Sequence, residues 1–204
     1  MNASTVIIGR TLGVAIRAMI VFTLVLGIGY TLVMTGVGQL IASSQADGSL
    51  VENADGEVVG SSLIGQTFTD DAGNPLPEYF QPRPSAAGDG YDGGASSGSN
   101  YGPENADLIA AIGERKAEIA AFNGVSEDDV PADAVTASGS GLDPDISEAY
   151  ALIQVNRVAE ARGLSVEVVT QLVEDHVEGR TFGYLGEPTV NVLELNLALD
   201  ALGD

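Results

Sequence analysis

Cysteine is absent from the 204-residue sequence, and histidine occurs once, at His176. Without cysteine the chain forms no disulfides, no zinc site built from thiolates and no thiol nucleophile. One histidine excludes a multi-histidine metal site within one chain, and no Gly-Lys-Ser/Thr of a phosphate-binding P-loop occurs. We therefore expect no metal site and no catalytic residue in this chain.

Acidic residues are missing before Asp47, and lysine occurs once, at Lys116. All 29 Asp and Glu residues therefore fall within residues 47–204, where only six Arg or Lys residues oppose them, leaving a net charge near −23. Such a charge repels nucleic acid and anionic lipid headgroups, so we expect no nucleic-acid partner. High acidity with little lysine suggests a protein adapted to concentrated salt, where screening removes the self-repulsion.

One long segment, residues 18–38, has no charged side chain at all. As a helix these 21 residues span about 31 Å, close to the roughly 30 Å of a bilayer's hydrocarbon core. A buried core helix is one alternative. A cleaved signal peptide is another, with small residues for cleavage at 42–44, although its apolar region would exceed the usual length of about 7–15 residues.

The flanking charges predict the orientation of this helix. Arg10 and Arg17 precede it, and no basic residue follows before Arg83. Positive charge stays in the cytoplasm. We therefore predict a single-pass protein of the cell membrane, surrounded by membrane lipid, with residues 1–17 cytoplasmic, a transmembrane helix at 18–41, and an extracytoplasmic domain at 42–204.

Small side chains recur every four residues along the predicted membrane helix, at Thr23, Gly27, Thr31 and Thr35. Such stripes let helix backbones approach closely, and threonine hydroxyls form hydrogen bonds across the contact. Glycine and threonine are also common in membrane helices without such a role. We interpret the four residues as candidates for docking against another transmembrane helix.

The domain at 42–204 is predicted to mix helices with short strands, an α+β fold. Residues 42–60 are polar with a turn at 55–56, and short strands are expected at 62–68 and 134–137. Residues 69–103 are rich in proline and glycine, a composition typical of disorder. They nevertheless keep four aromatic anchors, which favours a long ordered loop: Tyr79, Phe80, Tyr91 and Tyr101.

Apolar residues at helical spacing predict three helices, at 104–122, 145–162 and 165–179. Ser147 and Ser165 are the expected N-caps, and a glycine ends each helix. The last segment fits a strand by alternation from Val190 to Leu199. Asn191 followed by Glu194 instead indicates a helix start, and the Ala and Leu content favours the helix.

Other patterns that resemble functional sites have plainer interpretations. Residues 138–141, Ser-Gly-Ser-Gly, resemble a phosphate-cradling loop but lack its lysine, so a tight turn is expected. Asp175 and His176 point in different directions from one helix, which disfavours a catalytic triad. Arg157, Arg162 and Arg180 are each expected to pair with a nearby carboxylate, for Arg162 at Glu160 or in the following turn.

Three blocks of the sequence resemble one known family, the C subunit of the Kdp potassium-transporting ATPase. They occur in the family's order behind a single membrane helix, and the resemblance covers most of residues 6–202. The blocks are residues 79–86 with 91–103, residues 133–147 and residues 182–200, the last beginning Phe-Gly-Tyr-Leu-Gly-Glu-Pro.

The resemblance implies a non-catalytic accessory subunit of a high-affinity, ATP-driven potassium uptake complex. Its implied partners are a channel-like potassium-binding subunit and a P-type ATPase subunit. ATP is implied only through the complex, because family members are described as catalytic chaperones that raise the ATPase subunit's affinity for ATP. The alternatives are a membrane-anchored extracytoplasmic hydrolase, for which we find no nucleophile set, and an adhesion module, for which only the loop at 69–103 argues.

Overall fold

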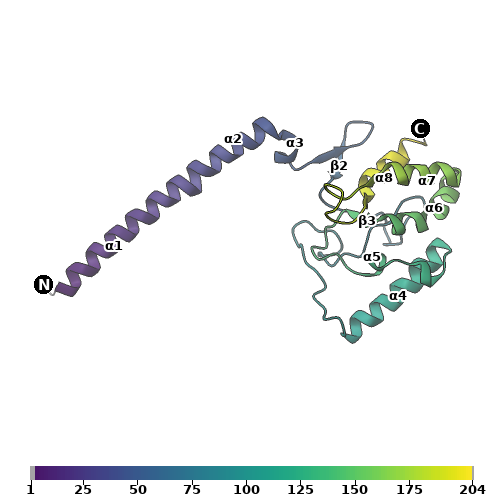
Figure 1. The fold of residues 1–204 in the computed structure, drawn as a ribbon, viewed down its shortest axis with the longest axis horizontal. Coiled ribbons are helices and arrows are strands. Elements are labelled where there is room, and N and C mark those ends of the chain that lie inside the picture. Colours follow the sequence, from purple (N-terminus) through teal and green to yellow (C-terminus); the bar gives the residue numbers. More distant parts are fainter. Residues whose placement is uncertain (1–2, 204) are drawn as a thin grey trace. The chain divides into compact units, whose positions relative to one another are not determined.

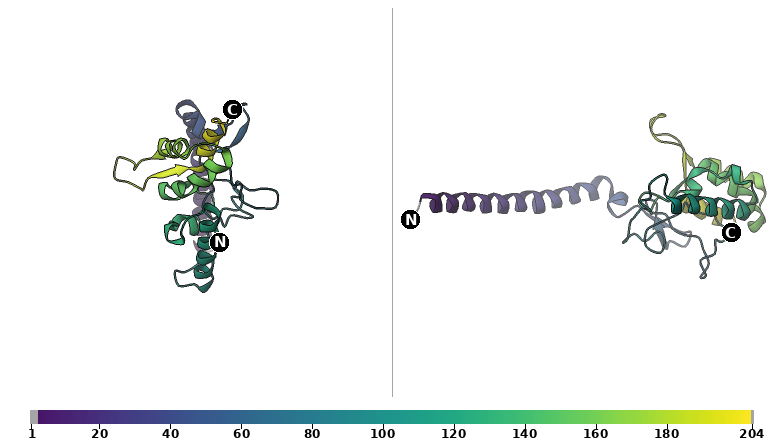
Figure 2. Two further views of the ribbon diagram at one scale, coloured as in Figure 1. Left: turned by 90° about the vertical axis from the view of Figure 1, so that its right-hand side faces the viewer. Right: turned by 90° about the horizontal axis from the view of Figure 1, so that it is seen from below.

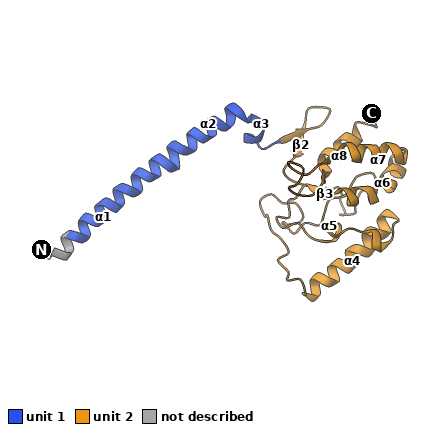
Figure 3. Cartoon of the chain, viewed as in Figure 1, with its two compact units in different colours: residues 1–49 blue, residues 50–204 orange. Residues whose placement is uncertain are grey.

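The computed structural model describes residues 3–203 and divides the chain into two compact units, residues 1–49 and residues 50–204 (Figure 3). The first unit is a long apolar helix with a short helical end. The second mixes helices with short strands.

The first unit is an unbroken helix in three parts: α1 (Ala3–Phe22), the π-helical η1 (Thr23–Tyr30) and α2 (Thr31–Ile41). Phe22 and Thr31, at the two junctions, keep right-handed helical backbone angles. Within residues 7–41 an 18-residue stretch reaches a mean hydropathy of 2.2, so the helix is long and apolar enough to cross a membrane. At Ala42 the backbone leaves the helical region, and α3 (Ser43–Ala46) follows.

The helix begins earlier than the sequence predicted. We expected it to begin at Ala18, but it is already helical at Ala3. Residues 3–17 contain no proline, and Arg10 and Arg17 are good helix formers, so nothing there stops the helix. The uncharged segment predicts which residues can lie in the hydrocarbon core of a membrane. The helix itself is longer, because it continues until the backbone leaves helical geometry at Ala42.

The second unit starts with a hairpin of β1 (Leu50–Glu52) and β2 (Val58–Ser61), paired antiparallel with an irregularity between Val51 and Glu52. The Asn53 side-chain oxygen accepts hydrogen bonds from the backbone N–H groups of Asp55 and Glu57, which closes the turn. The turn was predicted, but the hairpin was not. The strand expected at 62–68 is wrong: only isolated bridges occur there, such as Ser61 with Ile64.

Five helices and three strands follow the long loop (Figure 1): α4 (Ala106–Asn123), α5 (Ala132–Val135), β3 (Asp145–Ser147), α6 (Glu148–Arg162), α7 (Val166–Asp175), β4 (Val177–Glu178), β5 (Thr189–Asn191) and α8 (Val192–Asp200), with a 3₁₀ turn η2 at Glu127–Asp129. The strands form an antiparallel sheet in the order β3-β5-β4. Ile146 pairs with Val190, and Val177 pairs with the same residue from the other side.

Most predicted helix boundaries are confirmed by their caps. The hydroxyls of Ser147 and Ser165 accept from backbone N–H groups at the starts of α6 and α7, and the Asn191 side chain does the same for α8. Gly124 and Gly163 end α4 and α6 with positive φ values of 66° and 65°. The last segment is therefore a helix, as we favoured.

One further predicted element and two predicted helix boundaries are wrong. The strand expected at 134–137 is the short helix α5, which follows Pro131 and buries Ala134 and Val135. Residues 145–147 form a strand rather than the first turn of a helix. The helix expected to reach 179 ends at Asp175, because Val177 pairs with Val190 in the sheet.

The core of the second unit lies between the sheet and helices α6, α7 and α8. Leu193, Leu195 and Leu199 of α8 are buried, as expected for this segment. Phe80 of the long loop is fully buried in one cluster with Leu195 and Leu199. The core therefore includes part of a segment that by composition resembled a linker.

Candidate functional site

Two buried amides fix the long loop where it enters the core. The Gln154 side chain on α6 accepts from the Gln81 N–H at 2.7 Å and donates to the Gln81 carbonyl at 3.1 Å. The Asn196 side chain on α8 forms the same pair of hydrogen bonds with Phe80, at 2.9 and 3.0 Å. Each amide therefore satisfies one residue's backbone, as a neighbouring strand would.

Arg157 is the second anchor of this loop. Arg157 is only 9% exposed, yet among the residues that the structure describes no carboxylate forms an ion pair with its guanidinium. It donates to the carbonyl oxygens of Pro77 and Tyr79 and to the side-chain oxygen of Asn123, and it lies over the Phe122 ring, 4.4 Å from the ring centre. Burial lowers the pKa of Arg157 to about 10, so it stays charged at neutral pH.

The expected pairing of the arginines is confirmed only in part. Arg180 pairs with the nearby Glu187, but Arg162 pairs with Asp200, at 2.6 Å, rather than with Glu160 or the following turn. Arg162 also donates to the Glu78 carbonyl. The prediction failed for Arg157 because carbonyl oxygens of a loop replace the carboxylate, and sequence spacing does not reveal such partners.

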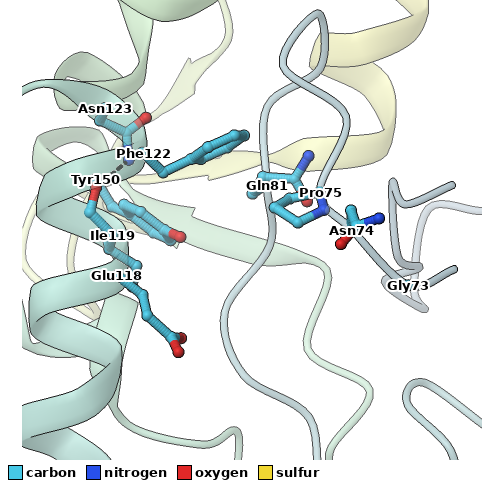
Figure 4. Close-up of a pocket in the computed structure, with 9 residues that line it drawn as sticks. All are labelled: Gly73, Asn74, Pro75, Gln81, Glu118, Ile119, Phe122, Asn123 and Tyr150. Carbon is cyan, nitrogen blue, oxygen red and sulfur yellow. Dashed lines mark hydrogen bonds between the residues drawn. The ribbon is translucent and has the colours of Figure 1, made fainter.

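A cavity of about 390 Å³ opens between α4 and the long loop (Figure 4). Glu118, Ile119 and Phe122 line it from the helix, and Pro75 and Gln81 face them from the loop. The other lining residues are Gly73, Asn74, Asn123 and Tyr150. None of the nine is basic and one is a carboxylate, so the lining repels a nucleotide phosphate rather than binding it.

The loop at 138–141 is a turn, as expected. The buried Ser138 hydroxyl oxygen accepts from the N–H of Gly141 at 3.0 Å, and the Ser140 oxygen accepts from the N–H of Leu142 at 3.0 Å. A Cβ at Gly141 would lie 2.6 Å from the Ser97 carbonyl oxygen. The N–H groups of Gly141 and Leu142 are therefore engaged inside the turn, and the Ser138 N–H donates to the Pro84 carbonyl at 3.0 Å.

A second polar cavity, about 380 Å³, lies beside β3 and contains three carboxylates: Asp145, Glu178 and Glu194. Burial, followed by the negative charges of Asp143, Glu178 and Glu194, raises the pKa of Asp145 to about 6. No group of three or more His, Cys, Asp or Glu residues among those described has the arrangement of a metal site. The carboxylates of this cluster repel one another, and protonation of Asp145 reduces that repulsion.

Among the described residues, the sequence patterns that could suggest a hydrolase do not come together. Asp175 accepts from Gln171, whereas the His176 ring lies 2.7 Å from the Leu172 carbonyl oxygen, so the two neighbours do not pair. Residues 94–98 have the spacing Gly-x-Ser-x-Gly, which our sequence prediction overlooked. Ser96 lies in a loop, without the strand-to-helix turn that exposes such a nucleophile, and its hydroxyl donates to the Ser140 carbonyl.

The docking candidates of the first unit lie in the middle of its helix. Thr23 and Gly27 fall in the π-helical stretch, and the hydroxyls of Thr31 and Thr35 donate to the carbonyl oxygens four residues earlier, both at 2.9 Å. A Cβ at Gly27 would meet only the Thr23 methyl group, at 3.8 Å. Packing within the chain therefore does not require glycine here, and docking stays a prediction.

Sequence reasoning missed Gln154, Asn196 and the loop-binding role of Arg157. One signal was present: Gln154 and Arg157 interrupt a helix face otherwise made of Ala151, Val155 and Val158. A buried polar residue on an apolar face requires a hydrogen-bonding partner. The pattern indicates that such a partner exists but not which segment supplies it.

Comparison with known proteins gives consistent matches over nearly the whole chain. A family model described as "K+-transporting ATPase, c chain" matches residues 12–201. The potassium-transporting ATPase KdpC subunit of Mycobacterium bovis is 53% identical over 194 residues, covering 95% of this chain and 99% of that protein. The protein of the same name from Kineococcus radiotolerans is 55% identical over 181 residues, covering 89% and 88%.

Proposed function

The chain belongs to the family of the c chain of the K⁺-transporting ATPase, and on this premise we propose that it is a non-catalytic accessory subunit of an ATP-driven potassium uptake complex. The observation that carries the proposal is the family match, which spans both the apolar helix and the folded unit. An anchored hydrolase or an adhesion module is not favoured, because neither accounts for a match of that extent.

The partners we infer are a channel-like potassium-binding subunit and a P-type ATPase subunit. In this arrangement the ATPase subunit binds and hydrolyses ATP, and the present chain raises the affinity for ATP through the complex, as the resemblance implies. The cavity beside α4, lined by one carboxylate and no basic residue, and the turn at 138–141, closed by the Ser138 hydroxyl, support a chain without its own nucleotide site. We therefore assign it no cofactor.

We propose that residues 42–204 lie outside the cytoplasm, with the apolar helix as a single membrane span. Arg10 and Arg17 support this orientation, because they are the only basic residues before Arg83. The unit is then positioned to act on the outer side of the channel-like subunit. Its negative charge would draw cations toward that surface.

The test is to purify the complex with and without this chain. The complete complex should show ATPase activity that potassium stimulates, the complex lacking the chain should lose it, and adding the chain back should restore it. The chain alone should hydrolyse no ATP. A complex that is fully active without the chain, or turnover by the chain alone, would contradict the proposal.

A further inference from the structure

The segment between β4 and β5, residues 179–188, projects away from the body of the second unit as the yellow-green loop in Figure 2. Three large apolar side chains stand at its tip: Phe182 is 84% exposed, Tyr184 71% and Leu185 49%. Phe182 and Tyr184 thus contribute little to the core of this chain. The same residues open the third block that resembles the family, and their exposure means that packing within the unit does not account for them.

The tip has a defined backbone shape. Thr181 and Leu185 exchange two backbone hydrogen bonds, at 2.9 and 3.0 Å, and the Gly183 N–H donates to the Arg180 carbonyl at 2.8 Å. Phe182 has a φ of 54°, in the left-handed region that a bulky residue rarely adopts. The chain therefore holds an unfavourable conformation that directs an aromatic ring toward solvent.

The tip is also electrically neutral within an acidic unit. Arg180 donates to Glu187, and these two are the only charged residues of 179–188. The remaining residues of 42–204 carry a net charge near −23. An anionic lipid surface would repel that unit, and a fluid bilayer does not require a fixed backbone shape. A neutral tip with Phe, Tyr and Leu has instead the composition of the buried centre of a protein interface.

We propose that residues 181–186 insert into an apolar pocket on another subunit of the ATPase complex, with Phe182 and Tyr184 as the anchors. This inference rests on the proposed function, which supplies the partner. The pocket has apolar walls and a hydrogen-bond acceptor near its rim, because the Tyr184 hydroxyl would otherwise be buried without a partner. The Arg180–Glu187 pair lies at the rim and adds little affinity.

The test uses full-length chain coexpressed with the other subunits, and compares F182S/Y184S with Y101S/I109S. The control removes two large apolar side chains that are 48% and 60% exposed elsewhere on the same unit. The first variant should copurify with the complex about tenfold less than the wild type, and the second should match the wild type. Because the altered side chains are exposed, thermal unfolding of the detergent-solubilised chains should be unchanged.

A photo-crosslinking residue at position 182 identifies the molecule that contacts the tip. A covalent product with another subunit of the complex is expected. Crosslinks only to lipid, or only to a second copy of this chain, would overturn the inference, as would lower thermal stability of F182S/Y184S. Failure of the wild-type chain to copurify would refute the proposed function itself. Normal copurification of both the wild type and F182S/Y184S would refute only the inference about the tip.

Discussion

The Gln154 amide is fully buried and bonds to both backbone groups of Gln81, accepting from its N–H and donating to its carbonyl. The two residues are 73 positions apart in the sequence. The pair holds the long loop against α6. The Gln154 side chain forms the two hydrogen bonds that a neighbouring β-strand would form with the Gln81 backbone. The loop side of the cavity beside α4 depends on this bond pair, because Gln81 lines it.

Gln154→Leu should destabilise the second unit. Leucine keeps the apolar volume but leaves the N–H and the carbonyl of Gln81 unpaired, at a cost of roughly 1–3 kcal/mol. Gln171→Leu on the exposed side of α7 is the matched control and should change stability little. Thermal unfolding followed by circular dichroism measures both. Equal effects of the two substitutions would show that the buried amide contributes nothing particular.

Gly141→Ala should be destabilising, and Gly139→Ala should not. Gly141 has a φ of 70°, and a Cβ there would lie 2.6 Å from the Ser97 carbonyl and 2.7 Å from the Ala87 Cβ. The backbone conformation alone costs an alanine about 1–3 kcal/mol. At Gly139 a Cβ meets nothing within 4 Å, and its φ is not in the left-handed region. Limited proteolysis of residues 85–100 measures the loosening of the adjoining loop.

Asp145 makes stability depend on pH in a defined direction. Burial, and then Asp143, Glu178 and Glu194, raise the pKa of Asp145 in the folded state to about 6 from 3.8. Between these values the folded state binds more protons than the unfolded state, so the free energy of unfolding falls as pH rises. Its contribution is most favourable below pH 4 and is lost as pH rises through about 6.

Asp145→Asn should remove the fall in the free energy of unfolding that ionisation of Asp145 causes. The variant should therefore be more stable than the wild type at pH 7 and differ little from it at pH 4. Unfolding midpoints at the two values test this. Glu160→Gln removes one carboxylate from an exposed position on α6 and serves as the control. If both variants shift stability equally at pH 7, relief of the overall charge explains the gain and the local cluster does not.

Local signals were sufficient to predict the four longer helices of the second unit, α4, α6, α7 and α8. Ser147 and Ser165 lie before apolar faces with helical spacing, and Asn191 followed by Glu194 starts α8, because a cap is made within a few residues of itself. The strands failed for the opposite reason. Residues 134–137 have strand-like composition, but a strand requires a partner, and the sheet partner of β3 is β5, more than forty residues away.

The candidate sites show the same limit. The order in residues 69–103 was expected from their aromatic anchors, and Phe80 and Tyr91 are indeed buried, whereas Tyr101 is 48% exposed. The stronger anchors are polar groups on helices far along the chain, above all Arg157. Sequence shows that a charge occupies an apolar face but not that loop carbonyls satisfy it. The exposure of Phe182 and Tyr184 could not be predicted from the sequence either, because alternating apolar residues are also typical of a buried strand.

Gly27→Leu should weaken association of the helix with the other membrane subunits. No packing within the chain opposes the substitution, so any loss of copurification reports on a neighbouring helix. Gly36→Leu is the matched control, because a Cβ at Gly36 meets nothing within 4 Å and the residue lies about 100° around the helix from Thr35. Equal behaviour of the two variants would reduce the stripe of Thr23, Gly27, Thr31 and Thr35 to an ordinary membrane anchor.

The orientation of the chain can be measured by thiol labelling, because the chain contains no cysteine of its own and an introduced one is its only labelling site. Ser99→Cys introduces one thiol at an exposed position of the second unit, and Asn2→Cys introduces one before the helix. With Arg10 and Arg17 holding the first residues in the cytoplasm, a membrane-impermeant maleimide added to intact cells should label residue 99. Residue 2 should be labelled only after permeabilisation.

The charges themselves can then be tested by combining Ser99→Cys with R10Q/R17Q. Removing both arginines takes away the asymmetry between the two ends of the span, so labelling of residue 99 on intact cells should decrease as part of the population inserts in the opposite direction. A chain labelled only at residue 2 would reverse the proposed orientation. Undiminished labelling of residue 99 in R10Q/R17Q would leave the orientation intact but assign it to the other subunits rather than to these two charges.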